Sequence, residues 1–213
     1  MPLRKQGGRR MPARMPAHTR WTRRRLPHVD APGHFQHVVF HLADSLPRDA
    51  LLRMERELAH LPAYQQQQTK ARRIEALLDT GRGTCLLGHP TCARIMVETL
   101  LFADGSRYQL HAWVVMPNHV HVLVRQDQHH PLSGIVQSWK RHSSREIRRL
   151  GYDVNRQAAS PHAGIWQRDY WDRYIRNDRH FSAVEEYIHL NPVKAGLVAT
   201  PEDWPYGSAG WGN

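Results

Sequence analysis

The stretch Tyr108–Val124 reads YQLHAWVVMPNHVHVLV. Residues 108–115 are rich in Trp and Val, and residues 119–124 alternate His with Val, so both runs have the composition of β-strands. Pro117 and Asn118 lie between them, and these residue types favour a tight turn. The stretch therefore predicts an antiparallel β-hairpin, from which the rest of the fold can be worked out.

Upstream of the hairpin, the sequence predicts one more strand and three helices. Residues 91–102 form an expected helix that ends before the turn Asp104-Gly105. Farther upstream, β-branched and aromatic residues predict a first strand over 35–42, FQHVVFHL. Between these two segments, apolar residues spaced three and four apart predict helices over 50–61 and 64–78.

Downstream of the hairpin, the sequence predicts a helix, a strand and a short final helix. Residues 131–150 form a basic amphipathic helix, and the Gly, Pro, Asn and Ser content of residues 151–164 indicates a loop. The aromatic run 166–175 is expected to be a strand. Residues 181–190 are expected to be a helix that Asn191-Pro192 stops, because the residue before a proline disfavours helical geometry.

The order of these elements predicts an α+β fold with a ferredoxin-like, split βαβ antiparallel sheet. An extra helix follows the last strand, and a helical insertion over 49–88 follows the first. We expect a single domain over 34–206, a disordered basic arm over 1–33 and a tail over 207–213. Such a topology serves many functions, so function must be argued from particular residues.

Charge points to a polyanionic partner, with nucleic acid as the first candidate. The chain has 30 Lys and Arg residues against 19 Asp and Glu, a formal net charge of +11. Residues 1–29 hold nine of these cations and no acid, which leaves 21 basic against 19 acidic residues elsewhere. With four prolines and few apolar residues, the arm is expected to stay solvated. Translation from Met11 or Met15 is the alternative account of the arm.

Composition also limits the location of the protein. Its two cysteines, Cys85 and Cys92, fit neither a disulfide framework nor paired zinc-ligand spacing. No apolar stretch reaches the roughly 20 residues that span a bilayer, and no apolar segment follows the N-terminal charges. We therefore expect a cytoplasmic protein without a membrane partner.

The pair His119 and His121 is the first candidate site. Residues two apart on a strand point the same way, so both imidazoles can share one cation. The spacing alone decides little, because a chain with 16 histidines in 213 positions contains about one such pair by chance. An ordinary surface strand is therefore the better explanation of the pair unless neighbouring segments support a site.

Such support comes from two longer segments, WVVMPNHVH at 113–121 and EYIHLNPVKAGLV at 186–198. Both resemble signature segments of the REP-associated tyrosine transposases, relatives of the single-tyrosine transposases in the HUH endonuclease superfamily. WQRDYWDRYIRN at 166–177 is similar to the family's W-Q strand, and PEDWPY at 201–206 is similar to its tail. The resemblance covers about residues 35–206.

The resemblance implies particular roles for four residues. His119 and His121 would be the metal-binding histidine pair, Tyr187 on the extra helix the catalytic nucleophile, and Asn191 a third metal ligand. Positions 187 and 191 lie one turn apart on the same helix face, which agrees with a shared site. Without the resemblance, Tyr187 could simply fill the core, and Asn191 could simply end the helix.

The implied activity is cleavage and rejoining of single-stranded or hairpin DNA through a covalent 5′-phosphotyrosine intermediate. A phenol is a poor nucleophile at pH 7 and a phosphodiester repels anions, so a divalent cation is expected to offset charge. Oxygen ligands favour Mg²⁺ or Mn²⁺, and two imidazoles shift the preference toward Mn²⁺. The resemblance further implies a bacterial, nucleoid-associated enzyme whose substrate is the foot of a repetitive extragenic palindrome hairpin.

DNA contacts are predicted on the helix 131–150 and on the strand 166–177, where cations alternate with aromatic rings. The residues chosen are Lys140, Arg168 and Arg173. Two alternatives stay open: a catalytically inactive DNA-binding protein, and a metal-dependent nuclease that uses water. The sequence leaves undecided whether the protein is a monomer or a homodimer.

Overall fold

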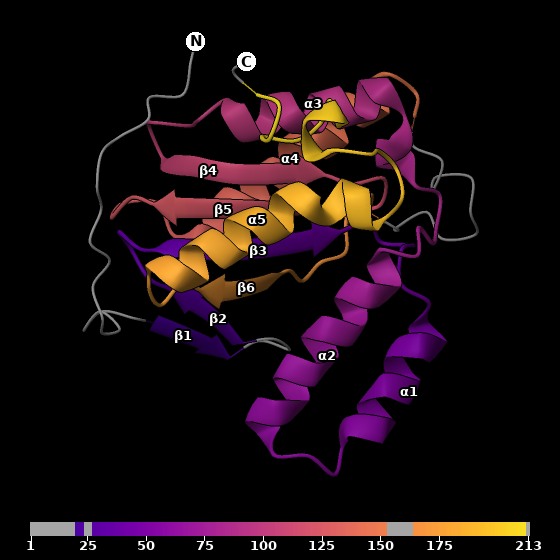
Figure 1. The fold of residues 1–213 in the computed structure, drawn as a ribbon, viewed down its shortest axis with the longest axis vertical. Coiled ribbons are helices and arrows are strands. Elements are labelled where there is room, and N and C mark those ends of the chain that lie inside the picture. The colour runs from indigo at the N-terminus through magenta and orange to yellow at the C-terminus, as the bar shows by residue number, and fades with distance from the viewer. Residues whose placement is uncertain (1–19, 24–26, 153–163, 212–213) are drawn as a thin grey trace.

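The computed structural model describes residues 20–23, 27–152 and 164–211 (Figure 1). Its centre is a four-stranded antiparallel sheet in the order β4-β5-β3-β6. The strands are β3 (Phe35–His41), β4 (Tyr108–Val115), β5 (His119–Gln126) and β6 (Trp171–Tyr174). This is the strand order of a split βαβ sheet, so the predicted α+β fold class is confirmed.

Helices cover both faces of the sheet (Figure 1). α3 (Pro90–Leu101) and α4 (Leu132–Arg149) lie on one face, where they bury Val120, Val122 and Val124 of β5. α5 (Asp178–Lys194) lies across the other face. Because side chains alternate along a strand, His119 and His121 point away from the main core and toward the face that α5 covers.

The predicted insertion is a helical hairpin made of α1 (Arg48–Leu58) and α2 (Ala63–Leu78). Ion pairs join the two helices, including Lys70 with Glu55. Figure 1 shows the hairpin extending away from the sheet, with the C-terminal end of α2 nearest to it. There, Leu78 is buried against Val39 of β3, so the end of α2 is fixed to the sheet.

The last helix is longer than predicted. The expectation that Asn191-Pro192 stops it is wrong, because α5 continues to Lys194 with both residues buried. Pro192 has no N–H and so cannot make one helical hydrogen bond. The helix instead ends after it in a Schellman motif, in which Gly196 has φ +68°. The Gly196 N–H donates to Val193 O, and the Leu197 N–H donates to Pro192 O. Asn191 therefore keeps helical geometry one turn after Tyr187.

The last strand is shorter than predicted. Instead of running over 166–175, it covers only Trp171–Tyr174, and Trp166 makes a single bridge to Leu42. The backbone carbonyls of residues 167–169 turn toward the Lys140 ammonium rather than toward a neighbouring strand. A hydrogen-bonding partner from α4 thus interrupts the ladder.

The ends of the chain also differ from the predicted boundaries. Within the arm, β1 (Arg20–Arg23) and β2 (Pro27–Asp30) pair as an antiparallel ribbon, which composition alone does not predict. Backbone pairing supplies order there that composition does not register. Residues 1–19 and 24–26 lie outside the described residues. After the short helix Pro201–Asp203, the tail packs on β4 through a bridge between Gly207 and Val114.

None of the helices in the described ranges combines the length and the apolar character needed to cross a membrane.

Candidate active site

The two motif histidines lie side by side on β5, beneath α5. Their side chains are fully buried, and their ring centroids are 4.7 Å apart. Burial lowers the pKa of His119 from 6.5 to about 3 and holds the pKa of His121 well below 6.5. Both rings are therefore neutral at pH 7, which is the form of imidazole that binds metals.

Asn118 fixes the tautomer of His119. Its amide nitrogen donates to the backbone carbonyls of Leu78 (3.0 Å) and Arg82 (3.1 Å), so its Oδ1 must face His119. The distance from Asn118 Oδ1 to His119 Nδ1 is 2.7 Å, and an oxygen can only accept. The proton of neutral His119 therefore sits on Nδ1, and Nε2 keeps its lone pair free for a ligand.

α5 carries Tyr187 and Asn191 to the same place. The helix begins at the side chain of Asn177, which accepts a 2.9 Å bond from His180 N–H, and it packs on the sheet through Val184 and Ile188. The Tyr187 ring centroid lies 5.6 Å from that of His121. The structure thus brings together four predicted site residues: His119, His121, Tyr187 and Asn191.

Three charged side chains surround the Tyr187 phenol. The Lys194 ammonium lies 4.7 Å from the ring centroid. Burial, followed by the carboxylates of Glu75 and Asp79 on the end of α2, raises the pKa of the phenol, while the Asn191 amide opposes that rise. In this state Tyr187 is protonated at neutral pH, so a nucleophilic role requires its proton to be removed as it attacks.

Several buried polar atoms around Tyr187 have no hydrogen bond of standard geometry. They are Nε2 of His119, Nε2 of His121, both polar atoms of the Asn191 side chain, and Oδ1 of Asp79. Such atoms are costly unless a ligand satisfies them. Their donor types, two imidazole nitrogens and amide or carboxylate oxygens, suit Mg²⁺ or Mn²⁺. The residues present therefore fit the divalent ion that the sequence resemblance implies.

A metal ion at this site would need Asn191 as its third ligand. Among the described residues, no three His, Cys, Asp or Glu side chains are gathered so that they could hold a metal ion by themselves. His119 and His121 supply two nitrogens, and Asp79 Oδ1 lies 3.8 Å from His119 Nε2. An amide oxygen from Asn191 would complete the set.

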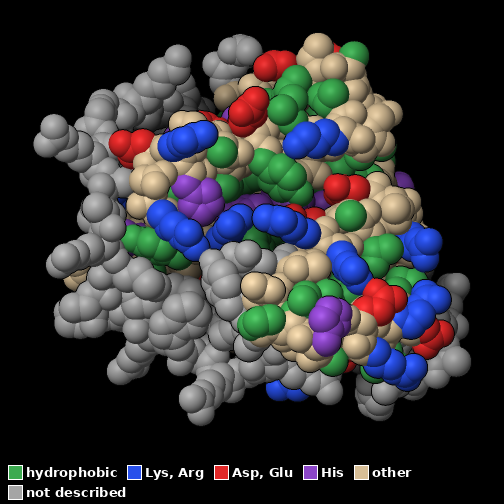
Figure 2. Space-filling model, turned by 60° about the horizontal axis from the view of Figure 1, so that its bottom comes forward, with side chains coloured by type: hydrophobic (Ala, Val, Ile, Leu, Met, Phe, Trp, Pro, Cys, Tyr) green, Lys and Arg blue, Asp and Glu red, His purple; other side chains and the backbone are tan. Residues whose placement is uncertain are grey.

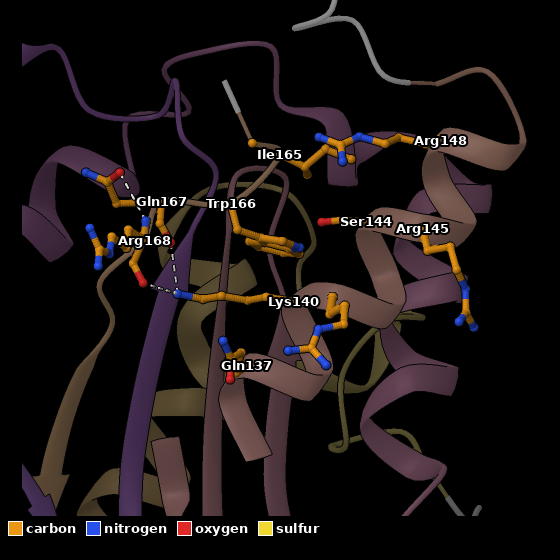
Figure 3. Close-up of a pocket in the computed structure, with 11 residues that line it drawn as sticks. Gln137, Lys140, Ser144, Arg145, Arg148, Ile165, Trp166, Gln167 and Arg168 are labelled. Carbon is orange, nitrogen blue, oxygen red and sulfur yellow. Dashed lines mark hydrogen bonds between the residues drawn. The ribbon is translucent and has the colours of Figure 1, made fainter. Parts of the chain in front are cut away.

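The predicted DNA-contact residues lie on different faces. Lys140 and Arg168 are on the α4 side of the sheet, opposite Tyr187. The Lys140 ammonium donates to the carbonyls of Gln167 (2.9 Å), Arg168 (3.3 Å) and Asp169 (2.9 Å), and burial lowers its pKa to about 8. Figure 3 shows this side chain reaching across to the backbone of Gln167 and Arg168. All three of its N–H groups are used in these bonds, which hold residues 167–169 against α4.

Arg168 lines a groove of about 570 Å³ between α4 and the segment 164–168 (Figure 3). Three further arginines line the same groove: Arg141, Arg145 and Arg148. A groove of this charge suits a phosphate backbone.

Arg173 is the predicted contact on the Tyr187 side. It pairs with His37 across β3 and β6, so its exposed side chain shares the face of the sheet that carries the histidines. Figure 2 shows Lys and Arg side chains in a row across the middle of one face of the molecule, with histidine beside them. By the same register Tyr174 pairs with Gln36 and points to the opposite face, away from the site.

Three residues near Tyr187 are not among the predicted site residues. His37 on β3 lies 3.1 Å from His121, Glu75 lies on α2, and Asp79 follows the last residue of that helix. His37 had a detectable signal, because the first strand neighbours the third in a split βαβ sheet and its odd-numbered residues share a face with His121. Glu75 and Asp79 had no such signal in the sequence, because their positions depend on how the helical insertion packs on the sheet.

Comparisons with known proteins agree with the resemblance. Residues 96–191 match the family model described as "Transposase IS200 like". A Haemophilus influenzae protein named for the REP-associated tyrosine transposases is 32% identical over 99 residues, which are 44% of this chain and 54% of that protein. The REP-associated tyrosine transposase of Escherichia coli K12 is 27% identical over 99 residues, 46% of this chain and 53% of that protein. The chain thus spans about half the length of these curated relatives.

One solved structure is also similar. A REP-associated tyrosine transposase bound to a REP hairpin aligns with a TM-score of 0.49 and 20% identity, over 85% of this chain and 79% of that one. The family match spans α4 and β5 with both motif histidines, Tyr187 and Asn191. The resemblance of this chain to the REP-associated tyrosine transposases, first indicated by its sequence motifs, is therefore confirmed.

Proposed function

We propose that this protein cuts and rejoins DNA strands at single-stranded or hairpin sites, with Tyr187 as the nucleophile and a divalent metal ion held by His119, His121 and Asn191. The observation that carries the proposal is the convergence of unsatisfied buried atoms beside Tyr187. Among the described residues, Nε2 of His119 and Nε2 of His121 have no hydrogen-bond partner, the Asn191 amide makes no hydrogen bond of standard geometry, and the phenol lies next to them. A structural core would leave few such atoms unpaired.

The proposed ion is Mg²⁺ or Mn²⁺. When bound, it would offset the negative charge of a phosphodiester and of the reaction's transition state. The chain's own residues prepare for it: Asn118 holds the His119 lone pair available, and burial keeps both histidines neutral. The exposed Lys194 adds a positive charge 4.7 Å from the centroid of the Tyr187 ring.

The proposed reaction is a transesterification. The Tyr187 oxygen attacks the phosphorus, a P–O Tyr bond forms, and the bond to the 3′ oxygen breaks. The phenol loses its proton and the departing 3′ oxygen gains one, so the products are a 5′-phosphotyrosine and a free 3′-hydroxyl. Because the ester energy is kept in the protein–DNA bond, another 3′-hydroxyl can reverse the step without ATP.

The proposed substrate class is DNA with a hairpin and an adjacent single strand. The basic groove beside α4 and the exposed Arg173 near the histidines give phosphate contacts on both sides of the sheet. The curated relatives are named for REP elements, which supports a REP-like palindrome as the substrate. A cytoplasmic, nucleoid-associated location follows from that proposal.

One experiment tests the function against its alternatives. The protein is incubated with an end-labelled hairpin oligonucleotide and Mn²⁺, with and without excess chelator, and then denatured on a gel. A covalent protein–DNA band that disappears with chelator supports the proposal. Free cut product without a covalent band would mean a nuclease that uses water, and uncut oligonucleotide that is retained before denaturation would mean a binding protein.

A further inference from the structure

His37 is packed tightly against the second motif histidine. It lies on β3, is buried, and its Nε2 is 3.1 Å from Nδ1 of His121. The two rings are nearly parallel, with an angle of 18° between their planes. The edges of two larger rings, Trp171 and Tyr187, contact His37 at centroid distances of 5.5 and 6.1 Å. These contacts leave the imidazole little freedom to rotate.

A hydrogen bond between two neutral imidazoles has two possible directions. In one, His121 Nδ1–H donates to His37 Nε2, and His121 Nε2 keeps a lone pair. In the other, His37 donates, and the His121 proton sits on Nε2, which is buried without an acceptor. A buried N–H without a partner costs about 1–3 kcal/mol, and a protonated Nε2 cannot bind a metal ion.

We propose that His37 is a positioning residue that accepts the His121 Nδ1–H bond and so keeps His121 Nε2 in the metal-binding form. This inference rests on the metal site proposed above. Each motif histidine would then donate its Nδ1–H to a buried acceptor, because Asn118 already holds His119 in the same tautomer. Partners of this kind orient metal-bound histidines, and their loss typically lowers metal affinity 10–100-fold.

Three variants separate this role from simple packing. His37→Leu removes the acceptor but keeps an apolar side chain in the site. His37→Gln places a side-chain oxygen near the position of Nε2 and can still accept. His142→Leu is the matched control, since it removes a histidine that makes one bond to Thr99 on the opposite side of the sheet.

The measurement is Mn²⁺ affinity by isothermal titration calorimetry at pH 7.5, without DNA. We expect His37→Leu to bind Mn²⁺ 10–100-fold more weakly, His37→Gln to recover most of that loss, and His142→Leu to match the unaltered protein. Equal affinities in all four proteins would overturn the role of His37. If His37→Leu does not fold, a His37→Gln affinity within about threefold of the unaltered protein supports the role, and a larger loss contradicts it.

A second readout does not depend on metal. Nitrogen-15 NMR of the metal-free protein reports which ring nitrogen of His121 carries the proton. We expect Nδ1–H in the unaltered protein, and a proton on Nε2 would overturn the inference. If the unaltered protein fails to bind Mn²⁺ while His121 shows Nδ1–H, the proposed metal site is wrong and the hydrogen-bond direction stands.

Discussion

Asn118 Oδ1 accepts a 2.7 Å hydrogen bond from Nδ1 of His119. The same amide donates to the carbonyls of Leu78 and Arg82, at the end of α2 and just after it. One buried side chain therefore ties the helical insertion to the first motif histidine. The insertion is part of the site, since it also brings Glu75 and Asp79 to Tyr187.

Replacing Asn118 should weaken both the fold and the metal site. Asn118→Ala leaves two carbonyls and one imidazole N–H without partners, so we expect a loss of roughly 2–3 kcal/mol in the free energy of unfolding. Mn²⁺ affinity should fall 10–100-fold because His119 can then change tautomer. Chemical denaturation and calorimetry measure the two effects.

Asn177→Ala is the matched control for that change. It removes the side-chain cap of α5, which should cost about 1 kcal/mol of stability, but it should leave Mn²⁺ affinity unchanged. If both variants lost affinity in proportion to their stability, Asn118 would be a structural residue only.

Glu75 should make stability depend on pH in an unusual direction. Burial and then the Asp79 carboxylate raise its pKa from 4.5 to about 7. The folded protein therefore binds this proton more tightly than the unfolded chain, and stability falls as pH rises from about 4.5 to 7. Glu75→Gln removes this penalty, so its melting temperature should exceed that of the unaltered protein at pH 8, and the difference should vanish near pH 4.5.

A series of thermal melts from pH 4.5 to 8.5 tests this. Glu57→Gln serves as a control, because Glu57 forms an exposed ion pair with Arg73 and its loss should bring no gain at high pH. Identical pH profiles for Glu75→Gln and the unaltered protein would show that the Glu75 carboxyl is ordinary.

Much of the fold could be predicted because its signals are local. The alternation of Val with His in 119–124 and the turn at Pro117-Asn118 define the hairpin that the structure contains. The order of strands and helices then leaves few arrangements of the sheet. The proximity of Tyr187 to the histidines also follows, since the extra helix must cover the open face of the sheet.

The features of the fold and of the site that the sequence did not predict depend on long-range contacts. Pro192 signals a helix end locally, yet burial of Asn191 and Pro192 against the sheet outweighs the lost hydrogen bond. A lysine in a basic amphipathic helix is expected to lie on the surface, and only the tertiary structure shows that the Lys140 ammonium donates to three carbonyls. The contributions of Glu75 and Asp79 depend on where the insertion docks, which periodicity does not encode.

Metal binding should depend on each motif histidine. His119→Ala and His121→Ala should each abolish cleavage of the hairpin oligonucleotide, and excess chelator should do the same in the unaltered protein. Asn191→Ala should be milder, because water can replace an oxygen ligand more readily than an imidazole. Cleavage rates with Mn²⁺ measure all three. Full activity in chelator would rule out the proposed metal site.

The N-terminal segment should contribute affinity without specificity. Residues 1–29 carry nine basic side chains and no acid. Deleting them should weaken binding to every DNA sequence, and losing four or five phosphate contacts should flatten the plot of log affinity against log salt by roughly three. The ratio between a matching and a scrambled hairpin, and the cleavage position, should stay the same. An unchanged salt slope would mean that this segment does not touch DNA.

The most direct test of the central claim is to locate the covalent bond between protein and DNA. After reaction with the hairpin oligonucleotide and Mn²⁺, nuclease and trypsin digestion should yield the peptide HFSAVEEYIHLNPVK, residues 180–194, whose only tyrosine is Tyr187. Mass spectrometry should find a nucleotide on this peptide, and Tyr187→Phe should form no adduct while keeping its hairpin affinity. A nucleotide on any other peptide, an adduct that persists in Tyr187→Phe, or cleavage without an adduct would contradict the assignment of Tyr187 as the nucleophile.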